Sequence, residues 1–151
     1  MVGGSTSDNR KFVVLDIETT GLRYRPHDAK TLRSNDIVYD EILQFAIVDA
    51  ASESLFYDSF SPIKHSSWTQ AQSIHGIAPR DIKDKAPFSS RKAEIQTIID
   101  AADLLVAYNA NFDLAFLSAQ GIELQDKRFV CLMKSFAQIH GRRGRYHISY
   151  T

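Results

Sequence analysis

The sequence predicts an α/β protein in which a mixed sheet is flanked by helices. Two observations lead to this prediction. Apolar runs of strand length come first and in quick succession, and further runs then alternate with segments of helical periodicity. Three strands in hairpin order, followed by helix, strand, helix and strand, imply that antiparallel strands are joined by parallel ones. The 151 residues suffice for one core and not for two.

The strands are predicted from short apolar or alternating runs bounded by polar residues. The run Phe12-Val13-Val14-Leu15 lies in the first strand, and the segment EILQFAIVD makes the second. The short turn Ala50–Ser54 joins the second strand to the third, as in a hairpin. The predicted strands span residues 11–16, 41–49, 55–60, 104–108 and 129–131.

The helices are predicted where apolar residues recur at intervals of three and four positions. Ile95, Ile98 and Ile99 show this spacing, and Gly76 and Gly121 end two of the helical segments. The predicted helices span residues 67–75, 91–102, 111–120 and 132–140, with a turn at 80–83 after Pro79.

Two polar segments are predicted to lie outside these elements. Residues 1–10 are rich in Gly and Ser and are expected to form a disordered tail, which leaves 11–151 as one domain. The stretch Arg23–Asp40 has mixed charges and no clear period, so it is predicted to be a long loop. Two interpretations of this loop stay open: a flap that faces a substrate, or an ordinary surface excursion.

The composition is typical of a soluble protein, with 44% hydrophobic residues and with 18 Lys and Arg against 18 Asp and Glu. From Gln120 onward, six basic residues stand against two acidic ones, a bias that suits a phosphate backbone or a solvated end. The single cysteine, Cys131, excludes an internal disulfide and is expected to be a buried thiol. Because we find no apolar run of membrane length and no signal-peptide pattern, we expect a cytoplasmic protein.

The strongest functional signal is the block Asp16-Ile17-Glu18-Thr19-Thr20-Gly21, which closes the first strand. Because a strand places residues i and i+2 on one face, Asp16 and Glu18 present two carboxylates side by side. In a central, buried strand these charges are costly unless a partner neutralises them, and divalent metal ions would do so. The alternative is an Asp-x-Glu that stands at a strand end by chance.

This block resembles the first motif of the DnaQ-like, or DEDD-type, 3′–5′ exonucleases, whose fold is ribonuclease H-like. The resemblance implies that Asp16 and Glu18 bind paired Mg²⁺ or Mn²⁺ ions. It also implies that three residues contact the terminal nucleotide through backbone groups and that the next wedges against its base; these are Thr19, Thr20 and Gly21, and then Leu22.

The segment Tyr108-Asn109-Ala110-Asn111-Phe112-Asp113 resembles the second motif of the family. The helix that it opens is apolar nearly all round, so Asp113 enters apolar surroundings and needs a partner. Asn111 is a natural N-cap, and an acid in the first turn complements the helix dipole, so a purely structural role stays open. The resemblance implies that Asp113 is the third metal-site carboxylate and that Asn109 and Phe112 shape the substrate pocket.

The third motif of the family, a His followed five residues later by an Asp, is missing from this sequence. His147 is the nearest candidate, but it follows Asp113 too closely for the family, and we interpret it as coincidence. We expect the C-terminal part of the fold to be absent, which would leave apolar sheet surface for a homodimer. His75 belongs to a His-Gly-Ile segment that also resembles the family, and we assign it to structure.

Two hypotheses about function follow. The first is a metal-dependent 3′–5′ exonuclease that shortens single-stranded DNA or RNA by two-metal-ion hydrolysis, with Asp16, Glu18 and Asp113 as catalytic and metal-binding residues. The second is an inactive nuclease-like module that binds metal and nucleic acid or a protein partner, since loss of a general base lowers a rate by about 10²–10⁴. Whether the chain alone is an enzyme stays open, as does the choice between DNA and RNA.

Overall fold

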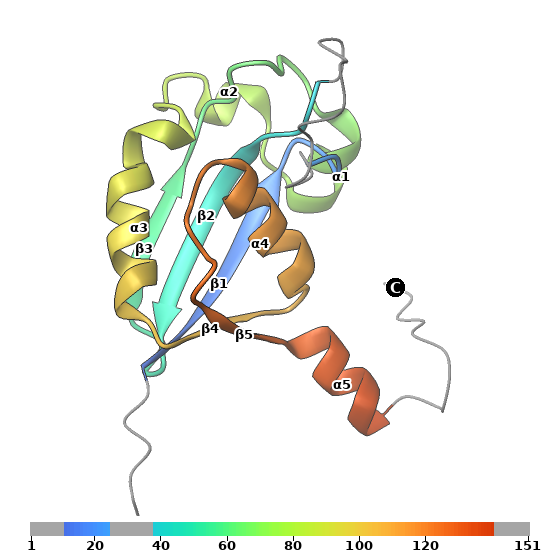
Figure 1. The fold of residues 1–151 in the computed structure, drawn as a ribbon. Helices are drawn as coiled ribbons and strands as arrows, with labels where there is room; N and C mark the ends of the chain where they lie inside the picture. The colour runs from blue at the N-terminus through green and yellow to red at the C-terminus, as the bar shows by residue number, and fades with distance from the viewer. Residues whose placement is uncertain (1–10, 25–37, 141–151) are drawn as a thin grey trace, which may run out of the picture.

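The computed structural model of the chain describes residues 11–24 and 38–140. The predicted tail, most of the predicted loop at 23–40 and His147 lie outside this part of the chain. The described residues form a five-stranded sheet in the order β3-β2-β1-β4-β5, against which helices pack (Figure 1). Because the sheet holds both antiparallel and parallel pairs, the predicted mixed α/β fold is confirmed.

The antiparallel half of the sheet contains β1 (Phe12–Thr19), β2 (Ile42–Asp49) and β3 (Ser54–Ser59). β1 pairs with β2, and β2 pairs with β3. The predicted hairpin turn between β2 and β3 is held by Asp49, whose Oδ1 accepts hydrogen bonds from the backbone N–H groups of Ala51 (2.8 Å) and Glu53 (2.9 Å).

The parallel half adds β4 (Leu104–Ala107) and β5 (Arg128–Cys131). α3 (Lys92–Ala101) leads into β4, and α4 (Ala110–Ala119) connects β4 to β5. β4 pairs with β1 only from Phe12 to Val14, so β1 extends well past the end of this pairing. That difference in length opens one edge of β1 at the level of the carboxylates.

The core lies between the sheet and these two helices, which are on the same side of it in Figure 1. Ile95 and Ile99 of α3 and Phe116 of α4 are fully buried, together with Leu15 of β1 and Phe45 of β2. Burial of each such side chain stabilises the fold by about 1.5–3 kcal/mol. The predicted burial of the Cys131 thiol is also found.

Three details differ from the predictions. β1 continues to Thr19 instead of ending at Asp16, so the carboxylate pair lies within the strand. The predicted turn after Pro79 is a short helix, α2 (Pro79–Ile82), because Asp81 Oδ2 accepts a hydrogen bond from the Ala78 N–H and closes its first turn. α4 begins at Ala110 with Asn109 in the N-cap position, so Asn111 is not its N-cap.

Two short helical elements and one peripheral helix complete the described chain. α1 (Thr69–His75) and the 3₁₀ helix η2 (Phe88–Arg91) lie between β3 and α3. α5 (Leu132–His140) follows β5, extends away from the sheet in Figure 1 and has no buried residue. Within residues 11–24 and 38–140, the helices are all too short or too polar to cross a bilayer.

Candidate active site

The first two candidate carboxylates come from alternation along β1. Val13, Leu15 and Ile17 point into the core, so Asp16 and Glu18 point to the opposite face of the sheet. Asp16 is exposed and Glu18 is partly buried. β1 is central, as predicted, but the face that carries the carboxylates is open at Asp16.

The third candidate carboxylate, Asp113, reaches β1 from the first turn of α4. Its Oδ1 accepts a hydrogen bond from the backbone N–H of Ile17 at 3.2 Å, and its side chain is only 4% exposed. Ile17 lies between Asp16 and Glu18 and beyond the residues that pair with β4. Asp113 therefore occupies the open edge of β1 between the two other acids, which satisfies a buried amide that would otherwise lack a partner.

The three acids hold their protons more strongly than acids in water do. Burial raises the pKa of Asp113 to about 7, with a further contribution from the negative charge of Asp16. Burial and then the charge of Asp16 raise the pKa of Glu18 as well. Partial burial raises the pKa of Asp16, although a hydrogen bond from the Ile17 backbone N–H lowers it in part. Negative charge is thus crowded at this end of β1.

A groove of about 780 Å³ lies beside these acids. Its lining includes six residues predicted for the site: Glu18, Thr19, Thr20, Gly21, Leu22 and Phe112. Leu22 is 80% exposed, which leaves its apolar side chain free to contact a ligand. Asp16, Asn109 and Asp113 are not among the lining residues. The substrate-binding and carboxylate parts of the predicted site therefore meet at Glu18.

The wall of the groove opposite β1 was not predicted. It includes Gln70 and Ile74 of α1, and the side chain of Ile74 is 82% exposed. His75, which was assigned to structure, lines the groove too and contacts the predicted site. The Ile77 N–H donates to His75 Nδ1 (3.1 Å), so Nε2 carries the proton and donates to the Thr19 carbonyl (3.1 Å). The available signal in the sequence was the segment His75-Gly76-Ile77, which resembles the family.

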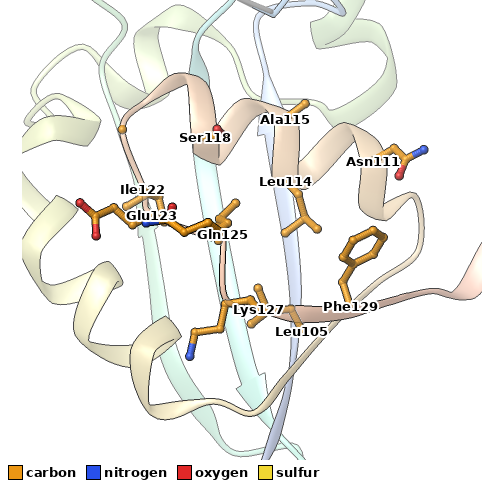
Figure 2. A pocket seen from close by; sticks show the side chains of 12 residues that line it. Leu105, Asn111, Leu114, Ala115, Ser118, Ile122, Glu123, Gln125, Lys127 and Phe129 are labelled. Carbon is orange, nitrogen blue, oxygen red and sulfur yellow. The ribbon is translucent and has the colours of Figure 1, made fainter. Parts of the chain in front are cut away.

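A second hollow, of about 600 Å³, lies between α4 and the parallel strands. Figure 2 shows Leu114 of α4 pointing towards Leu105 of β4 and Phe129 of β5. Asn111, the residue after Ala110 in α4, also lines this hollow. Because it contains none of the predicted site residues and no acid but Glu123, we do not assign the chemistry to it.

A metal site was predicted on Asp16, Glu18 and Asp113. In the part of the chain that the structure describes, no three His, Cys, Asp or Glu side chains are gathered closely enough to form a ready coordination shell. The donor set nevertheless suits a hard divalent cation, because it consists of carboxylate oxygens. Burial raises the pKa values of all three acids, and the negative charge of Asp16 adds to this for Glu18 and Asp113. Binding of such an ion would require these side chains to close around it.

Comparison with known proteins gives consistent matches. The profile of the RNase_T family, described as an exonuclease family, matches residues 13–150. The DNA polymerase III PolC-type of Oceanobacillus iheyensis is 30% identical over 117 residues, which cover 76% of this chain and 7% of that protein.

Solved structures give the same picture of the fold. E. coli exonuclease I in complex with a dA16 oligonucleotide has a TM-score of 0.61 at 18% identity, and the match covers 89% of this chain and 30% of that one. Exonuclease X in complex with 5′ overhanging duplex DNA has a TM-score of 0.56 at 20% identity, over 90% of this chain and 68% of that one. The chain thus spans a small part of its PolC relative and less than a third of exonuclease I.

Proposed function

The chain belongs to the DnaQ-like, or DEDD-type, 3′–5′ exonuclease family, and we propose that it removes nucleotides from the 3′ end of a single nucleic-acid strand. The observation that carries this proposal is the position of Asp113, whose carboxylate meets β1 between Asp16 and Glu18. An acid that only caps its own helix does not need to contact a strand. An acid that forms a site with two carboxylates on β1 must contact that strand. Three carboxylates near one another are what metal-assisted phosphodiester hydrolysis requires of a protein that supplies no nucleophile of its own.

We assign Asp16, Glu18 and Asp113 to the binding of Mg²⁺ or Mn²⁺. Carboxylate oxygens are the ligands that these hard ions prefer, and the crowded negative charge gives a cation a favourable place. When bound, a pair of such ions supplies an activated water and stabilises the leaving 3′ oxygen. The chain's own part is to hold the three carboxylates on β1 and α4 at one edge of the sheet.

The groove beside Glu18 is proposed to bind the terminal nucleotide. The segment Thr19–Gly21 offers backbone groups to the sugar and phosphate, while Leu22 and Phe112 offer apolar surface to the base. Asn109, at the start of α4, is proposed to border the same pocket. The oligonucleotide in the exonuclease I structure supports a single strand as the substrate class. DNA and RNA remain equal candidates in this proposal.

The proton acceptor for the attacking water is not assigned to a residue. The family resemblance implies a His followed five positions later by an Asp, and none of the five His residues in the sequence has an Asp at that position. The proposal therefore rests on the three carboxylates and on the groove beside them.

The test is digestion of a 5′-labelled single strand in the presence of Mn²⁺. We compare the unmutated protein with Asp16→Asn, and use Asp84→Asn as the matched control, because Asp84 is an exposed aspartate that lines neither hollow. Stepwise shortening by the unmutated and control proteins, with none by Asp16→Asn, is the expected result. Equal shortening by all three proteins would contradict the assignment of Asp16.

The same digestion decides the alternative of an inactive module. If no protein shortens the strand but Mn²⁺ still binds, as measured by calorimetry, the chain is a nuclease-like domain that holds ions without hydrolysis. Where the strand is shortened, DNA and RNA strands of the same sequence, run side by side, assign the preferred sugar.

A further inference from the structure

The segment that follows β1, Thr20–Arg23, is hydrogen-bonded to the two acidic residues immediately before β2. The Thr20 N–H donates to the Glu41 carbonyl, and the Glu41 N–H donates back to Thr20 Oγ1, both at 2.9 Å. Thr20 Oγ1 in turn donates to Asp40 Oδ1 (2.8 Å), and the Arg23 N–H donates to Asp40 Oδ2 (2.9 Å). Asp40 and Glu41 therefore fix the position of the segment that lines the groove.

The same two acids are held from the other side by the loop after β3. Glu41 accepts hydrogen bonds from the backbone N–H groups of Ile63 (2.8 Å) and Lys64 (2.9 Å). The His65 ring lies between the two carboxylates: Nδ1 donates to Glu41 Oε2 at 2.8 Å, and Nε2 is 3.3 Å from Asp40 Oδ1. The three side chains are each only 17–18% exposed, so solvent screens these interactions weakly.

Electrostatics agree with this arrangement. Burial by itself raises the pKa of Glu41, but the hydrogen bond from His65 and those from the Ile63 and Lys64 amides outweigh it and lower the pKa below its ordinary value. Glu41 is therefore a charged acceptor at neutral pH. A cationic or donor ring beside two carboxylates has a defined orientation, which limits how far Asp40 can turn.

Asp40 packs so closely against Gly21 that any movement of Asp40 also moves the lining of the groove. A Cβ atom added to Gly21 would lie 2.6 Å from Asp40 Oδ2, so the backbone of the segment and this carboxylate are in close contact. His65 itself does not line the groove, and the polar partners of its ring are Asp40 and Glu41. Any effect of His65 on the groove must pass through Asp40 and Glu41.

We infer that His65 is a positioning residue, which acts through Asp40 and Glu41 to hold Thr20–Arg23 in the shape that receives the terminal nucleotide. The hydrogen bonds alone show that His65 restrains this segment. That the restraint affects substrate binding rests on the proposed function. Removal of the ring donors frees Asp40 and Glu41 to turn, and the segment then samples other shapes. Because the carboxylates on β1 and α4 are untouched, the loss falls on binding and not on the chemical step.

The test variant is His65→Phe, which keeps a ring and removes both nitrogens. Hydrogen exchange of the Thr20 and Arg23 amides, measured without metal, is expected to be about tenfold faster than in the unmutated protein, the typical effect of one lost hydrogen bond. The Phe45 and Ile47 amides in the middle of β2 serve as the reference and are expected not to change. In the digestion assay, KM is expected to rise about tenfold while kcat stays within about threefold.

Two further variants make the result specific. His65→Asn retains a donor near the place of Nδ1, so the Thr20 amide is expected to regain part of its protection against hydrogen exchange. If His65→Phe does not fold, His65→Asn replaces it as the test variant. Lys64→Gln removes a positive charge from the exposed neighbouring side chain and is expected to leave exchange and KM unchanged.

Unchanged exchange of Thr20 and Arg23 in His65→Phe would overturn the inference, and so would faster exchange with a loss of kcat at constant KM. Absence of cleavage by the unmutated protein would contradict the proposed function alone, because the exchange of these two amides still decides whether His65 holds the segment.

Discussion

At the scale of single residues, Asp113 carries the most information. It is a carboxylate with 4% exposure in an apolar helix, and it accepts a hydrogen bond from the Ile17 N–H on another element. A side chain that served only its own helix would bond to that helix's free N–H groups. Asp113 accepts from its own backbone N–H and also joins α4 to the carboxylate pair on β1. Substitutions at this position separate its structural role from its chemical one.

Asp113→Asn and Asp113→Ala are expected to differ in a diagnostic way. Asn keeps an acceptor for the Ile17 N–H and loses the charge, so stability is retained while Mn²⁺ affinity falls at least about tenfold. Ala loses both and leaves the amide unsatisfied, which lowers the free energy of unfolding by about 1–3 kcal/mol. Urea unfolding and Mn²⁺ titration calorimetry measure the two effects. Normal Mn²⁺ affinity in Asp113→Asn would indicate a structural residue only.

The raised pKa of Asp113 predicts that Mn²⁺ binding depends on pH. The ion must displace a proton below the pKa of about 7, so affinity at pH 6 is expected to be about tenfold weaker than at pH 8. The calorimetric signal in buffers of different ionisation enthalpy reports the released proton. Asp113→Asn is the control, since its affinity should vary less over this range. An affinity that is constant from pH 6 to pH 8 contradicts the prediction.

The same shift has a consequence for the metal-free fold. The pKa of this carboxyl is near its ordinary value of 3.8 in the unfolded chain and is raised by burial to about 7 in the fold, so between these values the folded state binds more protons. The free energy of unfolding therefore falls as pH rises through this window and levels off above pH 7. Urea unfolding at pH 5 and pH 7.5, compared with Asp113→Asn, isolates the contribution of Asp113.

At the scale of elements, the end of β1 is shaped by what it packs against. Thr20 is buried, and Gly21 passes so close to Asp40 that a side chain would meet its carboxylate. Asp40 cannot easily move away, because its carboxylate accepts hydrogen bonds from the Thr20 hydroxyl and the Arg23 N–H. The glycine of the DIETTG block is thus required by its contact with Asp40, which lies just before β2, beyond any role towards a nucleotide.

Gly21→Ala is expected to lower the free energy of unfolding by about 1–3 kcal/mol through overpacking. Combination with Asp40→Ala should recover part of this loss, because the clash disappears, and a double-mutant cycle measures the coupling. Gly76→Ala is the matched control: Gly76 has a φ of +79° and nothing within 4 Å of the added atom, so its cost comes from the backbone and Asp40→Ala should not reduce it. If the changes in the free energy of unfolding caused by Gly21→Ala and Asp40→Ala were strictly additive, the steric explanation would be contradicted.

At the scale of the whole molecule, α5 is the least integrated part of the described chain. Leu132, Phe136 and Ile139 stand at i, i+4 and i+7 and are 42%, 55% and 75% exposed. An amphipathic helix with an open apolar stripe favours association. The homodimer predicted from the sequence stays a prediction, and this stripe is the surface on which we place it.

Sedimentation velocity over a range of protein concentrations measures this association. We expect the unmutated protein to form a reversible dimer and Phe136→Lys to be monomeric, since a charge in the stripe opposes burial. Gln138→Lys adds the same charge at an exposed position outside the stripe and should still dimerise. A monomer at all concentrations for the unmutated protein contradicts the prediction.

Much of the fold and half of the site could be predicted from the sequence because they depend on local patterns. Alternation along Val13–Ile17 determines that Asp16 and Glu18 share a face, and the helical spacing of Ile95 and Ile99 determines the buried side of α3. The family followed from two short motifs, Asp16–Gly21 and Asn109–Asp113, whose residues are close in sequence. Such local patterns can be recognised without knowledge of how the elements pack.

Tertiary structure alone decided how these pieces meet. The sequence does not reveal that β4 stops pairing at Val14, yet this is why the Ile17 amide is open to Asp113. It also does not bring His65 to Asp40 and Glu41, or His75 to the Thr19 carbonyl, since these partners are far apart along the chain. Local periodicity fixes which way a side chain faces, whereas register between strands and the packing of distant loops fix what it touches.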